Sequence, residues 1–194
     1  VIIEDSLSTF ISKLQETARR GGGVIHVKSQ MIIRGGNASN FASAIGSLGV
    51  RAVLIVYASE LGELLLRHFM KRLPVEVYTV KPAKDSLTVA LELKYGGTRS
   101  NVMIGYKGSL AEAEPGHLSG AISKLAQADI VGFFNWAAIN RGTELAEYVL
   151  GEAKSWGKAT YMDPSDVSVK RIDEVKGLVD RVLSAGLVDA ISLN

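Results

Sequence analysis

The chain has 194 residues, of which 47% are hydrophobic and 22% charged, a composition typical of a globular protein with a sizeable core. Its 22 Lys and Arg against 20 Asp and Glu leave a net charge of +2, too small to predict binding to nucleic acid or to an anionic membrane. The absence of cysteine excludes disulfides, a thiolate metal site and a cysteine nucleophile.

Two further features bear on location. No apolar run approaches the ~20 residues that span a membrane, and the N-terminus lacks the charged-then-apolar pattern of a signal peptide. We therefore expect an intracellular, cytoplasmic protein. The first residue is Val1 rather than Met, which suggests that the protein extends beyond this N-terminus.

The first 33 residues predict one helix and two short strands. Apolar residues recur at three- and four-residue steps from Leu7 to Ala18, the pattern of an amphipathic helix, which the triple glycine at 21–23 ends. Because no Gly-Lys-Ser/Thr follows these glycines, they are interpreted as a helix stop rather than a phosphate-binding loop. Residues 24–28 and 31–33 are predicted as strands.

A glycine pair opens the most informative stretch of the chain. Gly35 and Gly36 precede Asn37-Ala38-Ser39-Asn40, and a helix is predicted at 38–48. Glycines let the backbone adopt positive φ and approach a ligand closely, and the amides of the first helical turn remain unpaired. Such a corner suits hydroxyls or anions. From spacing alone, a glycine turn with an asparagine cap stays open as an alternative.

The next segments change from buried strands to an alternating pair. Residues 51–57 are predicted as a strand, because the consecutive apolar residues at 53–56 are typical of a parallel strand buried on both faces. A helix at 60–73 and a strand at 75–80 follow. From 87 to 94 and from 100 to 106 apolar and polar residues alternate around a Gly-Gly turn. Alternation predicts an antiparallel flap with one wet face at about 85–107. A plain solvated hairpin explains the pattern equally well.

The remainder alternates helix and strand. Helices are predicted at 118–126, 142–156 and 169–184, and strands at 129–134, 159–162 and 188–193. Thr143 is expected to cap the second of these helices. Such an order is typical of a parallel sheet covered on both sides. Because no linker or internal repeat interrupts it, residues 1–194 are interpreted as a single, incomplete α/β domain.

Polar residues follow two of these strands. Asn135 and Trp136 end one strand and Asp163 ends the next, at the carboxyl edge where open α/β sheets bind ligands. Trp136 is nevertheless expected to pack in the core or at its rim. Asp163 precedes Pro164, and Asp-Pro also opens turns, so a binding role and a turn role both remain.

The pattern Gly-Gly-Asn-Ala-x-Asn-x-Ala at 35–42, followed by Leu-Gly and an apolar strand, resembles the first signature of the ribokinase-like (PfkB-type) sugar and nucleoside kinases. The order of flap, Asp-Pro strand and terminal Leu-Asn strengthens the resemblance. It covers the N-terminal and middle portions of a family member. It implies an α/β fold with a mostly parallel sheet, helices on both faces and a small antiparallel β lid at about 85–107.

The same resemblance implies site residues and cofactors. The implied substrate-binding residues are Gly35, Gly36, Asn37, Asn40 and Asn101. Asp163 and Asn194 are implied on the nucleotide and magnesium side, with ATP and Mg²⁺ as cofactors, since Mg²⁺ can be held through water by a single carboxylate. The implied partners are a small sugar or nucleoside and a second copy of the chain through the lid, with no nucleic acid and no membrane.

The family's catalytic signature, Asp-Thr-x-Gly-Ala-Gly-Asp, is absent from the sequence, so no catalytic base and no metal ligand is named. The family's opening strand is not visible at Val1 either. A sheet ending at Leu193 would expose a strand edge and an apolar helix face. We therefore expect the protein to continue beyond Asn194, or a second chain to supply the rest.

The expected function of the intact protein is ATP-dependent phosphorylation of a sugar or nucleoside hydroxyl, with this chain inactive alone. A non-catalytic sugar- or nucleoside-binding module of the same fold is the alternative. A nicotinamide-dependent Rossmann enzyme is disfavoured, because Gly-x-Gly-x-x-Gly follows none of the predicted strands.

Overall fold

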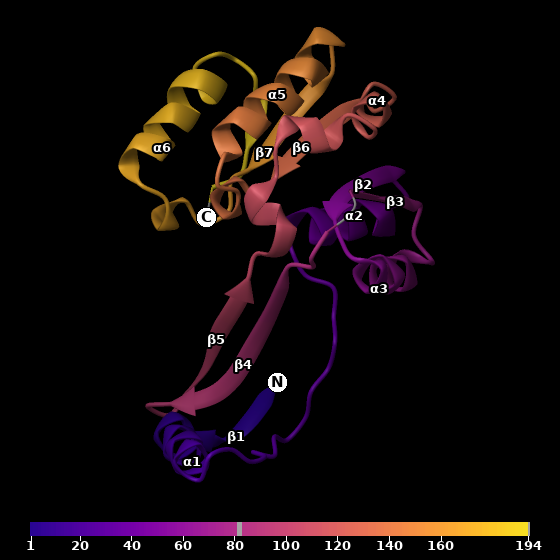
Figure 1. Ribbon diagram of the computed structural model, residues 1–194. Coiled ribbons are helices and arrows are strands. Elements are labelled where there is room, and N and C mark those ends of the chain that lie inside the picture. The colour runs from indigo at the N-terminus through magenta and orange to yellow at the C-terminus, as the bar shows by residue number, and fades with distance from the viewer. Residues whose placement is uncertain (81–82, 194) are drawn as a thin grey trace. The chain divides into compact units, whose positions relative to one another are not determined.

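The structure is a computed structural model that describes residues 1–80 and 83–193. The chain divides into two compact units (Figure 1). Unit 1 consists of Val1–Ile33 and Leu87–Tyr106, and unit 2 consists of Arg34–Ser86 and Lys107–Asn194.

The strands are β1 (Ile2–Ser6), β2 (Ala52–Tyr57), β3 (Val75–Val80), β4 (Leu87–Tyr95), β5 (Thr98–Tyr106), β6 (Ile130–Phe134), β7 (Ala159–Asp163) and β8 (Ala190–Ile191). The helices are α1 (Leu7–Arg19), α2 (Asn37–Ser47), α3 (Glu60–Met70), α4 (Ile122–Leu125), α5 (Gly142–Ser155) and α6 (Ile172–Leu178). Short 3₁₀ turns lie at Gly108–Glu112, Pro115–Leu118, Trp136–Ala138 and Val167–Val169, and a π turn at Val179–Leu183 extends α6.

Unit 1 is a three-stranded sheet with one helix. β4 and β5 form an antiparallel hairpin, here called the arm, in unbroken register from Leu87 opposite Tyr106 to Tyr95 opposite Thr98. β1 pairs with β4 in parallel. The Ser6 hydroxyl accepts the Thr9 N–H at the start of α1, and glycines with positive φ follow the helix, as the triple glycine predicted.

Two strand predictions in unit 1 are wrong. Residues 24–28 and 31–33 form no strand, and the one bridge in this stretch joins Ile2 to Ser29. Their apolar composition fits a strand, but a strand also needs a ladder partner. β4, the central strand of this sheet, has both edges occupied, by β1 and β5. β1 itself was not predicted, because its apolar run is short and lies directly before a helix.

Unit 2 contains the parallel strands that the sequence predicted. β2 and β3 pair in parallel from Ala52 opposite Val75 to Tyr57 opposite Val80. α2 and α3 cover one face of this pair through a small core made of Ala42, Leu54, Met70 and Val77. The segment around α4 covers the other face, where Lys124 forms an ion pair with Glu76 and lies 5.4 Å from the centre of the Tyr78 ring.

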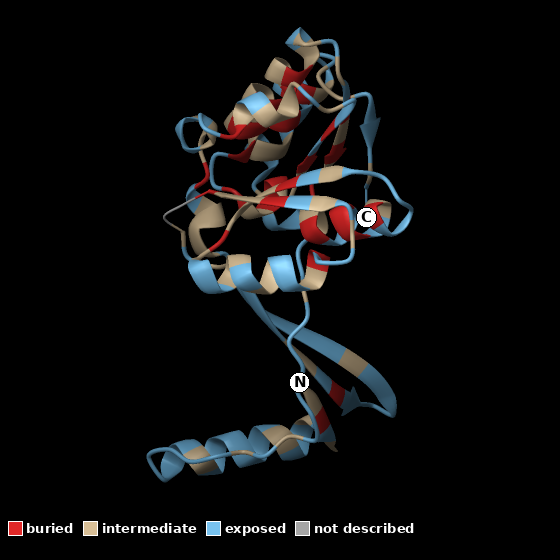
Figure 2. Ribbon diagram, turned by 90° about the vertical axis from the view of Figure 1, so that its right-hand side faces the viewer, coloured by how far each residue is buried: buried red, intermediate tan, exposed pale blue. Residues whose placement is uncertain are grey.

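The second sheet of unit 2 holds the main core. β6, β7 and β8 are parallel, and α5 and the helix of α6 with its π turn pack on one face to form this core. Figure 2 colours the buried residues red. Phe41 of α2 packs on the other face against Phe134 and Tyr161. Parallel strands with helices on both faces confirm the predicted α/β class.

Three local predictions for unit 2 need correction. The helix expected at 118–126 is a 3₁₀ turn followed by the short α4. Thr143 does not cap α5, which has Arg141 as its N-cap residue and no side-chain cap. The Thr143 hydroxyl instead accepts the indole N–H of Trp136 at 3.1 Å. Among the described residues, no helix has the length and apolar character needed to cross a membrane.

Candidate functional site

The Gly-Gly corner is an open backbone turn. Gly36 is the N-cap of α2, with φ +85° and ψ 141° and no side-chain cap. A residue with a Cβ would be strained at this φ. At both Gly35 and Gly36, no atom of the described residues other than the chain neighbours lies within 4 Å of the position that a Cβ would take. The corner therefore needs glycine at 36 and has free space beside it, and the alternative of an asparagine cap is wrong.

Asn37, the first residue of α2, is held by a carboxylate far along the chain. Its Nδ2 donates to Oδ2 of Asp163 at 3.1 Å. Oδ1 of the same carboxylate accepts the N–H of Ser165 at 2.9 Å and so supports that residue at φ +66°. Asp163 therefore connects the start of α2 to the carboxyl end of β7. The turn role predicted for Asp163 is confirmed.

An aromatic cluster lies beside the hydrogen bond between Asn37 and Asp163. Phe41 lies one turn after Asn37 and stacks on Tyr161 at 5.2 Å between ring centres, with an 18° interplanar angle. Phe134 lies 5.1 Å from Phe41 and 5.6 Å from Tyr161. A Cβ at Gly132 would meet the Phe134 ring at 2.6 Å, so a larger residue there would displace the ring. α2 is thus held on β6 and β7 by one hydrogen bond and two aromatic contacts.

Sequence reasoning missed the cluster, although a signal existed. The helical spacing from 37 to 41 and the strand spacing from 161 to 163 each place a polar and an aromatic residue on the same face. Nothing in the sequence indicated which helix would meet which strand. The structure thereby joins Asn37, predicted for the substrate, to Asp163, predicted for the nucleotide side.

Of the other predicted site residues, the structure describes two, and both are exposed. Asn40 is exposed, and its side chain forms no hydrogen bond within the described part of the chain. Asn101 lies in the arm opposite Glu92 and is exposed, on the face opposite Leu91 and Val102. Asn194 lies outside the described residues. Substrate or nucleotide binding by these residues remains a prediction.

Arg34, directly before the glycine pair, carries an unpaired donor. Its Nε is buried and has no hydrogen-bond partner among the described residues. A buried donor without an acceptor is unfavourable, because it has lost its water. Sequence reasoning did not assign Arg34 to the site, since an arginine next to a turn is ordinarily solvated.

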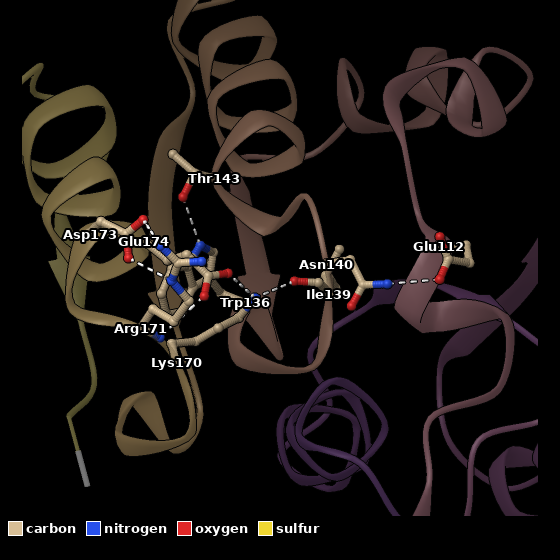
Figure 3. A network of polar contacts seen from close by, with 9 residues as sticks. All are labelled: Glu112, Trp136, Ile139, Asn140, Thr143, Lys170, Arg171, Asp173 and Glu174. Carbon is tan, nitrogen blue, oxygen red and sulfur yellow. Dashed lines mark hydrogen bonds and ion pairs between the residues drawn. The ribbon is translucent and has the colours of Figure 1, made fainter.

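The loop after β6 lies at the carboxyl end of β7, and the polar contacts around Trp136 hold it in place (Figure 3). Asn135 adopts φ +61° and donates its N–H to the Asp163 carbonyl at 3.0 Å. Trp136 is 1% exposed, which confirms its predicted place in the core. The Lys170 ammonium lies 5.3 Å from the Trp136 ring centre and donates to the Ile139 carbonyl at 2.7 Å and to Glu174 at 2.8 Å.

The carboxyl end of β2 carries a titratable cluster. The Tyr57 hydroxyl lies 3.3 Å from Nδ1 of His117, and Nε2 of His117 lies 3.4 Å from Glu114. Burial raises the pKa of Tyr57, so this phenol stays neutral at physiological pH. No group of three His, Asp or Glu side chains in the described ranges could hold a metal ion.

The sequence matches no protein-family model and none of the curated proteins. Solved structures do match. An adenosine kinase from Sinorhizobium meliloti is 19% identical over 98% of this chain and 54% of its own, with a TM-score of 0.64. A probable sugar kinase from Rhizobium etli is 20% identical over 98% and 59%, with a TM-score of 0.63.

The ribokinase of Arabidopsis thaliana, solved with ribose and ATP, is 14% identical over 87% of this chain and 51% of its own, with a TM-score of 0.61. At these identities the similarity establishes a shared fold. The chain spans between 51% and 59% of the length of these three structures.

Proposed function

We propose, starting from the ribokinase-like (PfkB-type) fold that this chain has, that the intact protein phosphorylates a hydroxyl of a sugar or nucleoside with ATP. This chain supplies the substrate corner. The observation that carries the proposal is the hydrogen bond from Asn37 to Asp163. It holds the open glycine corner at the carboxyl end of β7, the edge where open α/β sheets bind their ligands.

The groups at the corner suit a neutral polyol. A hydroxyl both donates and accepts, so it pairs with an amide side chain and with backbone N–H groups. The exposed Asn40 amide and the open space at Gly35 and Gly36 offer such partners. Three neighbouring residues thus provide complementary donors and acceptors.

Asp163 is the residue of this chain that we assign to the nucleotide side of the site. Its two oxygens accept one hydrogen bond each, whereas a carboxylate can accept about four. Mg²⁺ typically takes one or two carboxylates and keeps several waters, so Asp163 fits a water-mediated role beside a magnesium nucleotide. Bound ATP and Mg²⁺ would supply the phosphoryl group and neutralise its charge. No residue of this chain is proposed as the base.

The arm is proposed as a lid of one α/β domain that the rest of the protein completes. Strand alternation gives it two different faces. Asn101 and Glu92 lie on one face, which suits a polar ligand. The other face carries a row of exposed large residues: Leu87, Val89, Val102, Ile104 and Tyr106. That row suits a second copy of the chain, because contiguous exposed apolar surface marks protein interfaces.

The test is a coupled ADP-release assay on the full-length protein with a panel of pentoses, hexoses and nucleosides. We expect turnover with at least one of them. Asn40→Ala should raise KM about tenfold with little change in kcat, because it removes a contact made in both ground and transition states. Asn140→Ala, which removes a surface hydrogen bond to Glu112, is the matched control. Absence of turnover, with binding unaffected by Asn40→Ala, would contradict the proposal.

A non-catalytic binding module of the same fold is the second candidate. It shares the fold and the substrate corner with the kinase hypothesis, and a fold does not by itself decide between binding and phosphoryl transfer. Calorimetry on the full-length protein distinguishes the two. Ligand binding without turnover at any Mg²⁺ concentration would select the module, and turnover would select the kinase.

A further inference from the structure

We infer that Asp85 is a positioning residue that fixes the root of the arm, defined as residues 84–86 and 107–109, on the first turn of α3. The contacts involved lie inside unit 2, and their role does not depend on the proposed function. Both strands of the arm leave unit 2 at this root, between residues 86 and 87 and between residues 106 and 107.

The two halves of the root are joined to each other. Lys84 donates its N–H to the Ser109 hydroxyl at 2.8 Å, and Ser109 returns its N–H to the Lys84 carbonyl at 3.0 Å. The Ser86 hydroxyl donates to the Lys107 carbonyl. Gly108 has φ +59°, and a Cβ there would lie 2.4 and 2.5 Å from the carbonyl oxygens of Lys84 and Asp85. Only glycine allows so close a crossing.

Asp85 then attaches this root to α3. Its Oδ1 accepts the N–H of Ser59 at 2.7 Å, and its Oδ2 accepts the Ser59 hydroxyl. Ser59 is the N-cap of α3 and accepts the N–H of Gly62 at 3.2 Å. A carboxylate is favourable at a helix N-terminus, and its hydrogen bonds are stronger than neutral ones. The contact is partly buried, which protects it from water.

Gly62 gives independent support. Glycine inside a helix is unfavourable relative to alanine, so its presence in the first turn of α3 needs a reason. A Cβ at this position would lie 2.0 Å from Oδ1 of Asp85. Gly62 therefore leaves room for the carboxylate, and α3 is adapted to receive Asp85.

The consequence is a preformed base for the arm. With the root hydrogen-bonded and anchored on α3, the root itself should open rarely. Its two lysines, Lys84 and Lys107, are trypsin sites, so the rate of cleavage there measures how often the root opens.

The experiment is limited trypsin digestion of the full chain under native conditions, with fragments identified by mass. Asp85→Ala should speed cleavage at Lys107 about tenfold or more, because it removes hydrogen bonds to a charged group. Cleavage at Lys84 is not compared in this variant, since Asp85 itself follows that scissile bond. Asp85→Asn should give an intermediate rate, since the amide oxygen still accepts the Ser59 N–H. Gly62→Ala should also speed root cleavage, and Gly62→Ala with Asp85→Ala should cleave no faster than Asp85→Ala alone.

Gly151→Ala is the matched control. Gly151 lies in α5, and apart from its own helix no atom in the described part of the chain lies within 4 Å of the position that a Cβ would take there, so alanine should leave root cleavage unchanged or slower. Equal root cleavage in the wild type, Asp85→Ala and Gly62→Ala would overturn the inference. Equal acceleration at Lys176, in α6, would overturn it too, because the substitution would then unfold the whole unit.

Discussion

The hydrogen bond between Asn37 and Asp163 gives the sharpest prediction. A hydrogen bond to a charged group contributes about 1.5–3 kcal/mol, and partial exposure places this one near the lower limit. Alanine is a better helix former than asparagine by about 0.5 kcal/mol, which offsets part of the loss at the first position of α2. Asn37→Ala should therefore destabilise unit 2 by about 1 kcal/mol.

Urea unfolding followed by tryptophan fluorescence measures this change. Both tryptophans, Trp136 and Trp156, belong to unit 2, so the signal reports that unit. With a slope of about 2 kcal/mol per molar urea, the midpoint should fall by about 0.5 M. Asn40→Ala, in the same helix and exposed, should change the free energy of unfolding by less than about 0.5 kcal/mol.

A double-mutant cycle isolates the bond itself. Asp163→Ala also loses the Ser165 contact, so its single effect should exceed that of Asn37→Ala. The two substitutions together should cost about 1.5 kcal/mol less than the sum of their separate effects, because they remove the same bond and the helix propensity of alanine cancels in the cycle. Additivity within about 0.3 kcal/mol would show instead that the two side chains are energetically independent, and the bond would then have no part in holding α2 on β7.

Three further predictions concern other parts of the chain. Gly132→Ala should destabilise unit 2 by about 1–3 kcal/mol and lower its Tm, because the new methyl group displaces the Phe134 ring; an unchanged Tm would contradict the contact. The hydrogen bond from Lys154 holds the pKa of Asp189 below its ordinary value. The Asp189 carboxylate therefore contributes stability above about pH 3.9 and loses it as pH falls through the lowered pKa. Asp189→Asn has no such carboxylate, so its free energy of unfolding should fall less over that pH range. If the arm joins two copies, Ile104→Lys should convert a dimer to a monomer in light scattering, and an unchanged mass would exclude that face.

Much of the fold was predictable because its signals are local. The apolar run at 52–57 and the alternation at 87–94 each reflect how a strand is buried, and both strands form as expected. The strand predicted at residues 24–28 does not form, for a different reason. Their composition is compatible with a strand, but strand formation depends on a partner edge that no local pattern specifies.

The features of the site were also predictable only where the local sequence determines them. A positive φ at Gly36 follows from the glycine pair, and the sequence indicated it. The contact of Asn37 with Asp163 spans 126 residues and arises from packing of α2 on β7, which composition does not encode. The buried Arg34 Nε and the ring stacking of Phe41 on Tyr161 likewise depend on tertiary neighbours.

Whether the glycine corner binds the substrate can be decided by an NMR titration of the ¹⁵N-labelled full-length protein with the sugar or nucleoside selected by the ADP-release screen. We predict that the largest amide shifts occur at Gly35, Gly36, Asn37 and Asn40. Saturating shifts confined to other residues, with these four amides unmoved, would show that the substrate binds elsewhere.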